Sequence, residues 1–158
     1  MPHAATQQPE CHCTIVRWCL QLFIGGIIFA SALGKSLDLP GFVAVLNTYR
    51  AFPDSALWPL ALGVTGVEFV LGAWFLSGWR LQTSALVGAG LNTVYAVWMT
   101  SSLLRGLELT NCGCFGVFFP QPLTWFSPVE DLVMVGLCLV LRRLTKTKHA
   151  RFICRRAL

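Results

Sequence analysis

The sequence predicts an all-α integral membrane protein, a bundle of four transmembrane helices with both termini in the cytoplasm. Two observations predict this class. Of the 158 residues, 55% are hydrophobic and only 12% are charged, about half the roughly 25% charge of a typical soluble domain. The basic residues also gather beyond the last apolar segment, and no acid accompanies them: Arg142, Arg143, Lys146, Lys148, Arg151, Arg155 and Arg156. By the positive-inside rule, this tail lies in the cytoplasm.

The same composition argues against three other classes of protein. A soluble domain this short needs a larger polar surface, because small domains leave much of their chain exposed. Disorder requires low hydrophobicity, and a nucleic-acid module requires a basic folded face. We therefore expect a multi-pass protein of the bacterial inner (plasma) membrane. Its predicted partners include the lipid bilayer and no nucleic acid.

The chain divides into a polar N-terminal segment (1–13), a four-helix membrane domain (14–144) and a basic tail (145–158). The first span covers about residues 14–34, which is close to the 20 apolar residues that cross a bilayer. Ala30-Ser31-Ala32 also resembles the cleavage site of a secretory signal. The apolar run is longer than in such signals and continues into Gly34-Lys35, so we expect a retained helix, although the sequence leaves cleavage open.

The second and third spans are predicted at about residues 57–76 and 81–104. One acid, Glu68, interrupts the second span, whereas the third is the longest uncharged helical candidate. Arg80 then lies in a short cytoplasmic loop. Between the first two spans, residues 39–50 could form a short helix lying in the membrane interface.

The fourth span is predicted at about residues 128–144. Ser127-Pro128-Val129-Glu130 has the form of a helix start, with Ser as N-cap and Pro at the first helical position. This span reaches only about 25 Å, so Glu130 and Asp131 should sit at or just below the outer interface. Small residues recur every four positions in the first span, at Gly26, Ala30 and Gly34, which favours close helix packing.

The outward loop after the third span carries Asn111-Cys112-Gly113-Cys114-Phe115-Gly116. A disulfide between cysteines two residues apart requires a sharp bend, because an extended chain holds their Cα atoms too far apart. Gly113 permits the bend and Gly116 adds a second flexible point. A bridge in so small a ring should be strained and therefore prone to exchange. The pattern favours a working dithiol at Cys112 and Cys114, with structural use and metal ligation as alternatives.

Two acids are candidates for proton handling. Glu68 lies near the middle of the second span, where an ionisable group is costly and normally has a partner. Lys35 is the nearest basic candidate; otherwise a protonated Glu68 would hydrogen-bond to Ser31, Asn92 or Thr93. Asp131 could approach the cysteine loop and accept a proton during thiol exchange.

The remaining cysteines are weaker candidates. Cys11-His12-Cys13 could bind a soft metal such as Cu(I) or Zn, although it lacks a fourth ligand. Cys19 and Cys138 lie inside spans and read as small apolar residues, and Cys154 lies in the basic tail. Two other functions stay open: a soft-metal (copper- or mercury-type) carrier that uses both Cys-x-Cys sites, and a structural subunit of a membrane complex. No cofactor motif is evident; a quinone is possible, but no residue pattern supports one.

Taken together, four features resemble the MauE family of methylamine utilisation membrane proteins, within the wider DoxX-like redox-associated proteins. They are Gly34-Lys35 after the first span, Tyr49 before a proline-containing turn, Glu68 in the second span, and the Cys112-Gly113-Cys114-Phe115-Gly116 element. The resemblance covers roughly residues 14–142, and the cysteine element is its most specific part. Cys11-His12-Cys13 and the basic tail are not part of the family pattern.

The resemblance implies a four-helix transmembrane bundle that assists the maturation of periplasmic methylamine dehydrogenase. The small subunit of that enzyme carries many disulfides and a tryptophan-derived quinone, and family members act beside a thioredoxin-like partner of the MauD type. By this resemblance, Cys112 and Cys114 are the redox pair of a thiol–disulfide oxidoreductase component, and Asp131 falls where the family tends to carry an acid. The sequence does not identify the client protein, the direction of electron flow or the oligomeric state.

Overall fold

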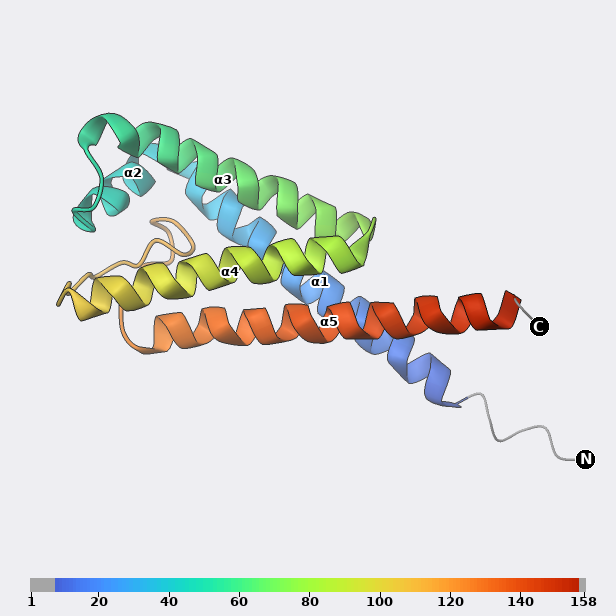
Figure 1. The fold of residues 1–158 in the computed structure, drawn as a ribbon. Coiled ribbons are helices and arrows are strands. Elements are labelled where there is room, and N and C mark those ends of the chain that lie inside the picture. The colour runs from blue at the N-terminus through green and yellow to red at the C-terminus, as the bar shows by residue number, and fades with distance from the viewer. Residues whose placement is uncertain (1–7, 157–158) are drawn as a thin grey trace, which may run out of the picture.

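The computed structural model describes the backbone of residues 8–156 and side chains over residues 14–146, and this part of the chain is helical without strands (Figure 1). Five helices follow one another there: α1 (Gln8–Leu37), α2 (Leu39–Thr48), α3 (Asp54–Ser77), α4 (Leu81–Leu104) and α5 (Phe126–Arg156). The prediction of an all-α protein is confirmed.

Three helices agree closely with the sequence. Helix α4 has the predicted bounds of the third span, and α2 confirms the short helix expected within residues 39–50. Helix α3 begins three residues before the predicted start of the second span. Pro53 caps it with extended backbone (φ −68°, ψ 151°), and Gly78 ends it in the left-handed region at φ 68°, as glycine commonly does at a helix C-terminus.

Helix α5 differs from the prediction at both ends. It begins at Phe126, so Ser127 lies in the first turn rather than at the cap, and it continues to Arg156 instead of ending near residue 144. The predicted end came from the change to charged residues, which does not by itself end a helix. Lys, Arg, Leu and Ala are good helix formers, and residues 145–158 contain neither Gly nor Pro.

Two stretches in the described part of the chain are long and apolar enough to cross a membrane, Thr14–Leu37 and Asp54–Ser77, each of 24 residues. They overlap the first and second predicted spans, 14–34 and 57–76. Transmembrane placement of α4 and α5 stays a prediction.

The bundle consists of two tightly packed helix pairs. Helix α1 packs mainly against α3 and α4 mainly against α5, while α3 and α4 meet less extensively. The main core joins the two pairs through buried apolar side chains, among them Ile24, Ile28, Leu71, Phe75, Ala85, Ala89, Cys138 and Leu141. Helix α2 and the loop between α4 and α5 lie at one end of the molecule, opposite the α3–α4 turn (Figure 1).

Candidate functional site

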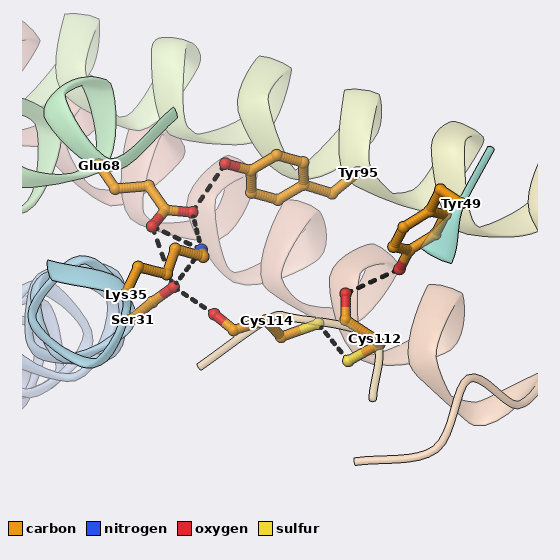
Figure 2. Close-up of polar contacts among 7 residues, drawn as sticks. All are labelled: Ser31, Lys35, Tyr49, Glu68, Tyr95, Cys112 and Cys114. Atoms are coloured by element: carbon orange, nitrogen blue, oxygen red, sulfur yellow. Dashed lines mark hydrogen bonds and ion pairs between the residues drawn. The ribbon is translucent and has the colours of Figure 1, made fainter. Parts of the chain in front are cut away.

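The loop between α4 and α5 brings the two predicted redox cysteines together. The Sγ atoms of Cys112 and Cys114 lie 2.8 Å apart, as a thiol–thiol hydrogen bond (Figure 2). Gly113 between them has φ 79°, and Gly116 has φ 72°. Both angles lie in the left-handed region that favours glycine. The sharp bend predicted at Gly113 is therefore present, and it turns both thiols to the same side.

Hydrogen bonds hold the cysteine loop in this conformation. The Asn111 side chain accepts a bond from the Gly113 N–H (2.8 Å) and donates one to the Gly116 carbonyl (3.0 Å). This is the local bonding by which Asn stabilises turns. The Cys112 N–H donates to the Gln121 carbonyl at 2.7 Å. The two thiols thus lie on a loop whose conformation these hydrogen bonds stabilise.

The loop rests directly on helix α1 through two glycines. A Cβ atom built on Gly34 would lie 2.5 Å from the carbonyl oxygen of Phe115, and one built on Gly116 would lie 2.5 Å from the carbonyl oxygen of Gly34. Only glycine fits at such a close approach of two backbones. Gly34 therefore accommodates the loop rather than a neighbouring helix, and an added Cβ at Gly26 meets nothing within 4 Å. The helix-packing role predicted for these two positions is wrong.

A buried ion pair lies beneath the loop. Lys35 Nζ is 2.6 and 2.7 Å from the two carboxylate oxygens of Glu68, and the side chains are 4% and 2% exposed. Lys35 also donates to Ser31 Oγ at 2.8 Å, and Tyr95 Oη donates to Glu68 at 2.7 Å (Figure 2). The paired charges and these hydrogen bonds satisfy groups that would otherwise be costly to bury. Lys35, proposed from sequence as the nearest base, is the partner of Glu68.

The other candidate partners of Glu68 have a different role. Asn92 and Thr93 each donate to a carbonyl of their own helix, at 2.8 Å. Tyr95, which the sequence analysis missed, takes their place. A signal for it was present, because Ser84, Gly88 and Asn92 form a buried stripe on α4, and Tyr95 continues this stripe one helical turn further.

Hydrogen bonds connect this network to the cysteine loop. Ser31 lies 3.1 Å from Glu68 and 2.5 Å from the Cys114 carbonyl, to which its Oγ donates. Tyr49 Oη donates to the Cys112 carbonyl at 2.7 Å (Figure 2). Burial, followed by the nearby cysteines, raises the pKa of Tyr49 well above its usual value. Tyr49 therefore stays protonated and continues to donate.

The two thiols differ in acidity. The hydrogen bond from Cys114 lowers the pKa of Cys112 to about 7, against the opposing effect of burial. The same bond, burial and the negative charges of Cys112 and Asp131 raise the pKa of Cys114. This difference favours Cys112 as the thiolate and Cys114 as the thiol that keeps its proton. A nucleophilic thiolate beside a second thiol can carry out disulfide exchange in two successive attacks.

All four predicted site residues line one cavity of about 670 Å³: Cys112, Cys114, Glu68 and Asp131, together with Lys35. Asp131, on the first turns of α5, has an Oδ2 atom that is buried without a hydrogen-bond partner in the described part of the chain. The predicted approach of this acid to the cysteine loop agrees with its place in the cavity wall.

The other cysteines lie elsewhere. Cys19 is exposed on α1 and Cys138 is buried in the core, both as free thiols. The side chains of Cys11-His12-Cys13 and Cys154 lie outside the described residues. Among the side chains that the structure describes, no three His, Cys, Asp or Glu residues gather to hold a metal ion.

Comparison with known proteins identifies the family. A family model described as methylamine utilisation protein MauE matches residues 12–143. The methylamine utilization protein MauE of Paracoccus denitrificans is 29% identical over 127 residues, covering 80% of this chain and 68% of that protein. The protein of the same name from Paracoccus versutus is 25% identical over 125 residues, covering 79% and 67%. No solved structure matches. The chain therefore belongs to the methylamine utilisation protein MauE family.

Proposed function

We propose that this chain is a multi-pass inner-membrane protein that exchanges thiols and disulfides with a periplasmic partner during methylamine dehydrogenase maturation. The single observation that carries the proposal is the contact of Cys112 and Cys114, 2.8 Å apart on a braced loop. Family membership and two relatives named for methylamine utilization support the pathway. The proposed partner is a thioredoxin-like protein of the MauD type, and the proposed client is the disulfide-rich small subunit.

Exposed apolar side chains support a membrane position for all four long helices. They lie on α1, α3, α4 and α5, and include Leu22, Phe23, Leu62, Val67, Val70, Val94, Val97, Leu132, Val133 and Val140. Apolar surface of this extent marks contact with lipid or protein. The α3–α4 turn lies at the end opposite the cysteine loop (Figure 1). This agrees with the proposed four crossings, in which this turn faces the cytoplasm together with both termini and the cysteine loop faces the periplasm. Alkaline phosphatase should be active when inserted at Glu108 and inactive when fused after Leu158; the reverse pattern contradicts this topology.

The exchange step follows from the acidity of the two thiols. The Cys112 thiolate attacks one sulfur of a partner disulfide, forming a mixed disulfide and releasing the other partner sulfur as a thiolate. Cys114 then loses its proton and attacks Cys112, which closes the Cys112–Cys114 disulfide and releases the second partner thiolate. In the reverse direction, the same steps oxidise a partner dithiol to a disulfide. This is the direction that forms the disulfides of a disulfide-rich client.

The test uses variants of the full chain in membranes. Cys112→Ser or Cys114→Ser should each abolish the exchange, since the remaining thiol lacks its resolving neighbour and can trap a mixed disulfide with the thioredoxin-like partner. Alkylation with a mass-tagged maleimide, before and after reduction, reads the state of the pair.

The matched control is the joint replacement of the five other cysteines: Cys11, Cys13, Cys19, Cys138 and Cys154. This variant should retain exchange. The redox function is wrong if Cys112 and Cys114 stay reduced under oxidising conditions. Co-purification of copper or zinc with the reduced pair would favour the soft-metal carrier instead.

A further inference from the structure

The cavity beside the two thiols has the size and walls of a site for a lipophilic ring. Its volume of about 670 Å³ falls within the roughly 300–1,000 Å³ of small-molecule sites. All five helices of the described chain and the cysteine loop contribute to its walls, which are mainly apolar. Several aromatic side chains are among them, including Phe42, Tyr95 and Trp98. Such a cavity favours a flat, largely apolar ligand.

A few polar groups line this apolar space. The Asn92 amide donates one hydrogen to the Gly88 carbonyl (2.8 Å), which leaves its second hydrogen for a ligand acceptor. Asp131 contributes an oxygen without a partner in the described part of the chain, and Cys112 and Cys114 contribute sulfur. An acyl chain would leave these polar groups unsatisfied, and burying a polar group without a hydrogen bond is costly. A ring with carbonyl oxygens would accept a hydrogen bond from Asn92, and in its hydroquinone form it would donate one to Asp131.

The charges of the cavity argue against phosphate-bearing redox cofactors. Lys35 is the one Lys or Arg among the described lining residues. Its three N–H groups already point to Ser31 and to the two oxygens of Glu68. A nicotinamide or flavin nucleotide would therefore find no cation for its phosphates, whereas an uncharged ring needs none.

We infer that this cavity binds the ring of a membrane quinone, which accepts the electrons of the Cys112–Cys114 dithiol. This inference rests on the proposed thiol exchange and gives it a direction. The sulfurs form one S–S bond and lose two S–H bonds, so the pair releases two electrons and two protons. The quinone gains both and becomes a hydroquinone. Asp131 receives the thiol proton in transit and passes it to a ring oxygen. The disulfide then oxidises the thiols of the periplasmic partner and returns to the dithiol.

The experiment uses the full chain in lipid nanodiscs, with Cys112 and Cys114 as its only cysteines, reduced with dithiothreitol and desalted without oxygen. Decylubiquinone is added as the probe, and ultraviolet absorbance follows its reduction. We expect about one hydroquinone per chain, because a dithiol carries two electrons. Maleimide tagging should show the pair oxidised over the same time course.

A matched pair of variants on α3 tests the cavity. Val64 lines it, whereas Val70 is 69% exposed and lies outside its lining. Val64→Trp should slow quinone reduction about tenfold or more, because the indole occupies the space of the ring. Val70→Trp should reduce quinone like the parent. The thermal midpoint and gel-filtration profile of Val64→Trp in detergent establish that it is folded.

Oxidised glutathione, added to the reduced parent protein in a parallel arm, separates the two hypotheses. If glutathione oxidises the pair and decylubiquinone does not, the quinone inference is overturned and the thiol-exchange function stands. If neither reagent oxidises the pair, both are overturned. Equal rates in folded Val64→Trp and Val70→Trp would place the reaction outside the cavity and overturn the inference. Native mass spectrometry that finds phospholipid retained in the cavity, without quinone reduction, would overturn it as well.

Discussion

Removing Lys35 should strongly destabilise the protein, because it leaves Glu68 as a buried carboxylate without a cation. The two side chains are 4% and 2% exposed and are held at 2.6 Å. Breaking a buried pair by removing one partner costs about 3–5 kcal/mol, far more than an exposed pair contributes. Glu68 keeps the hydrogen bond from Tyr95, which stabilises the remaining carboxylate and favours the lower end of this range. We therefore expect Lys35→Met to lose about 3 kcal/mol of unfolding free energy.

The assay is reversible unfolding of the detergent-solubilised protein by added SDS, followed by circular dichroism. Lys146→Met is the matched control, since Lys146 is exposed on α5, and it should stay within about 0.5 kcal/mol of the parent. Replacing both partners, Lys35→Met with Glu68→Leu, should recover about 2 kcal/mol or more, because no charge is then buried alone. If Lys35→Met loses no more than the control, or if the double variant is less stable than the single one, the burial argument is refuted.

Three further predictions concern the cysteine loop. The alkylation rate of Cys112 should rise with pH around its pKa of about 7. Cys114→Ala should move this rise up toward the ordinary value of 9.0, because the hydrogen bond between the two thiols is lost. Tryptic mapping of the alkylated cysteine across a pH series measures both profiles, and an unchanged profile in Cys114→Ala contradicts the lowered pKa of Cys112. Gly34→Ala should expose the loop to limited proteolysis because its Cβ meets the loop backbone at 2.5 Å, while Gly26→Ala should not; equal cleavage of the two refutes the contact. Tyr49→Phe removes a 2.7 Å bond to the loop and should cost about 1 kcal/mol, measurable in the same SDS titration, with no change as the contrary result.

The sequence predicted those elements that local chemistry determines. The bounds of α4 followed from an uncharged run between Arg80 and Arg105. The bend at Gly113 followed from the spacing of the two cysteines, which no extended chain could bring together. The charged tail, by contrast, predicted where lipid ends and gave no information on where the backbone leaves the helix, so α5 was predicted too short.

Contacts between segments that are distant in the sequence were harder to predict from the sequence. Lys35 and Glu68 are 33 residues apart, so depth alone suggested their pairing, and nothing local could establish it. The bond from Ser31 to the Cys114 carbonyl spans 83 residues. Gly34 matched a helix-packing stripe, although its function is to admit a loop backbone. A stripe of small residues predicts close approach without identifying what approaches.

If α1 crosses the membrane as proposed, the contact of the cysteine loop with α1 would make the Cys112–Cys114 pair sensitive to membrane thickness. The apolar stretch Thr14–Leu37 has 24 residues, or about 36 Å of helix, which exceeds the roughly 30 Å of a typical hydrocarbon core, so a membrane-spanning α1 would fit by tilting. A thinner bilayer increases that inclination. Because Gly34 and Ser31 hold the loop at the outer end of this helix, a change in tilt displaces the backbone that carries the two sulfurs. Lipid chain length would thereby become a physical variable of the proposed thiol chemistry.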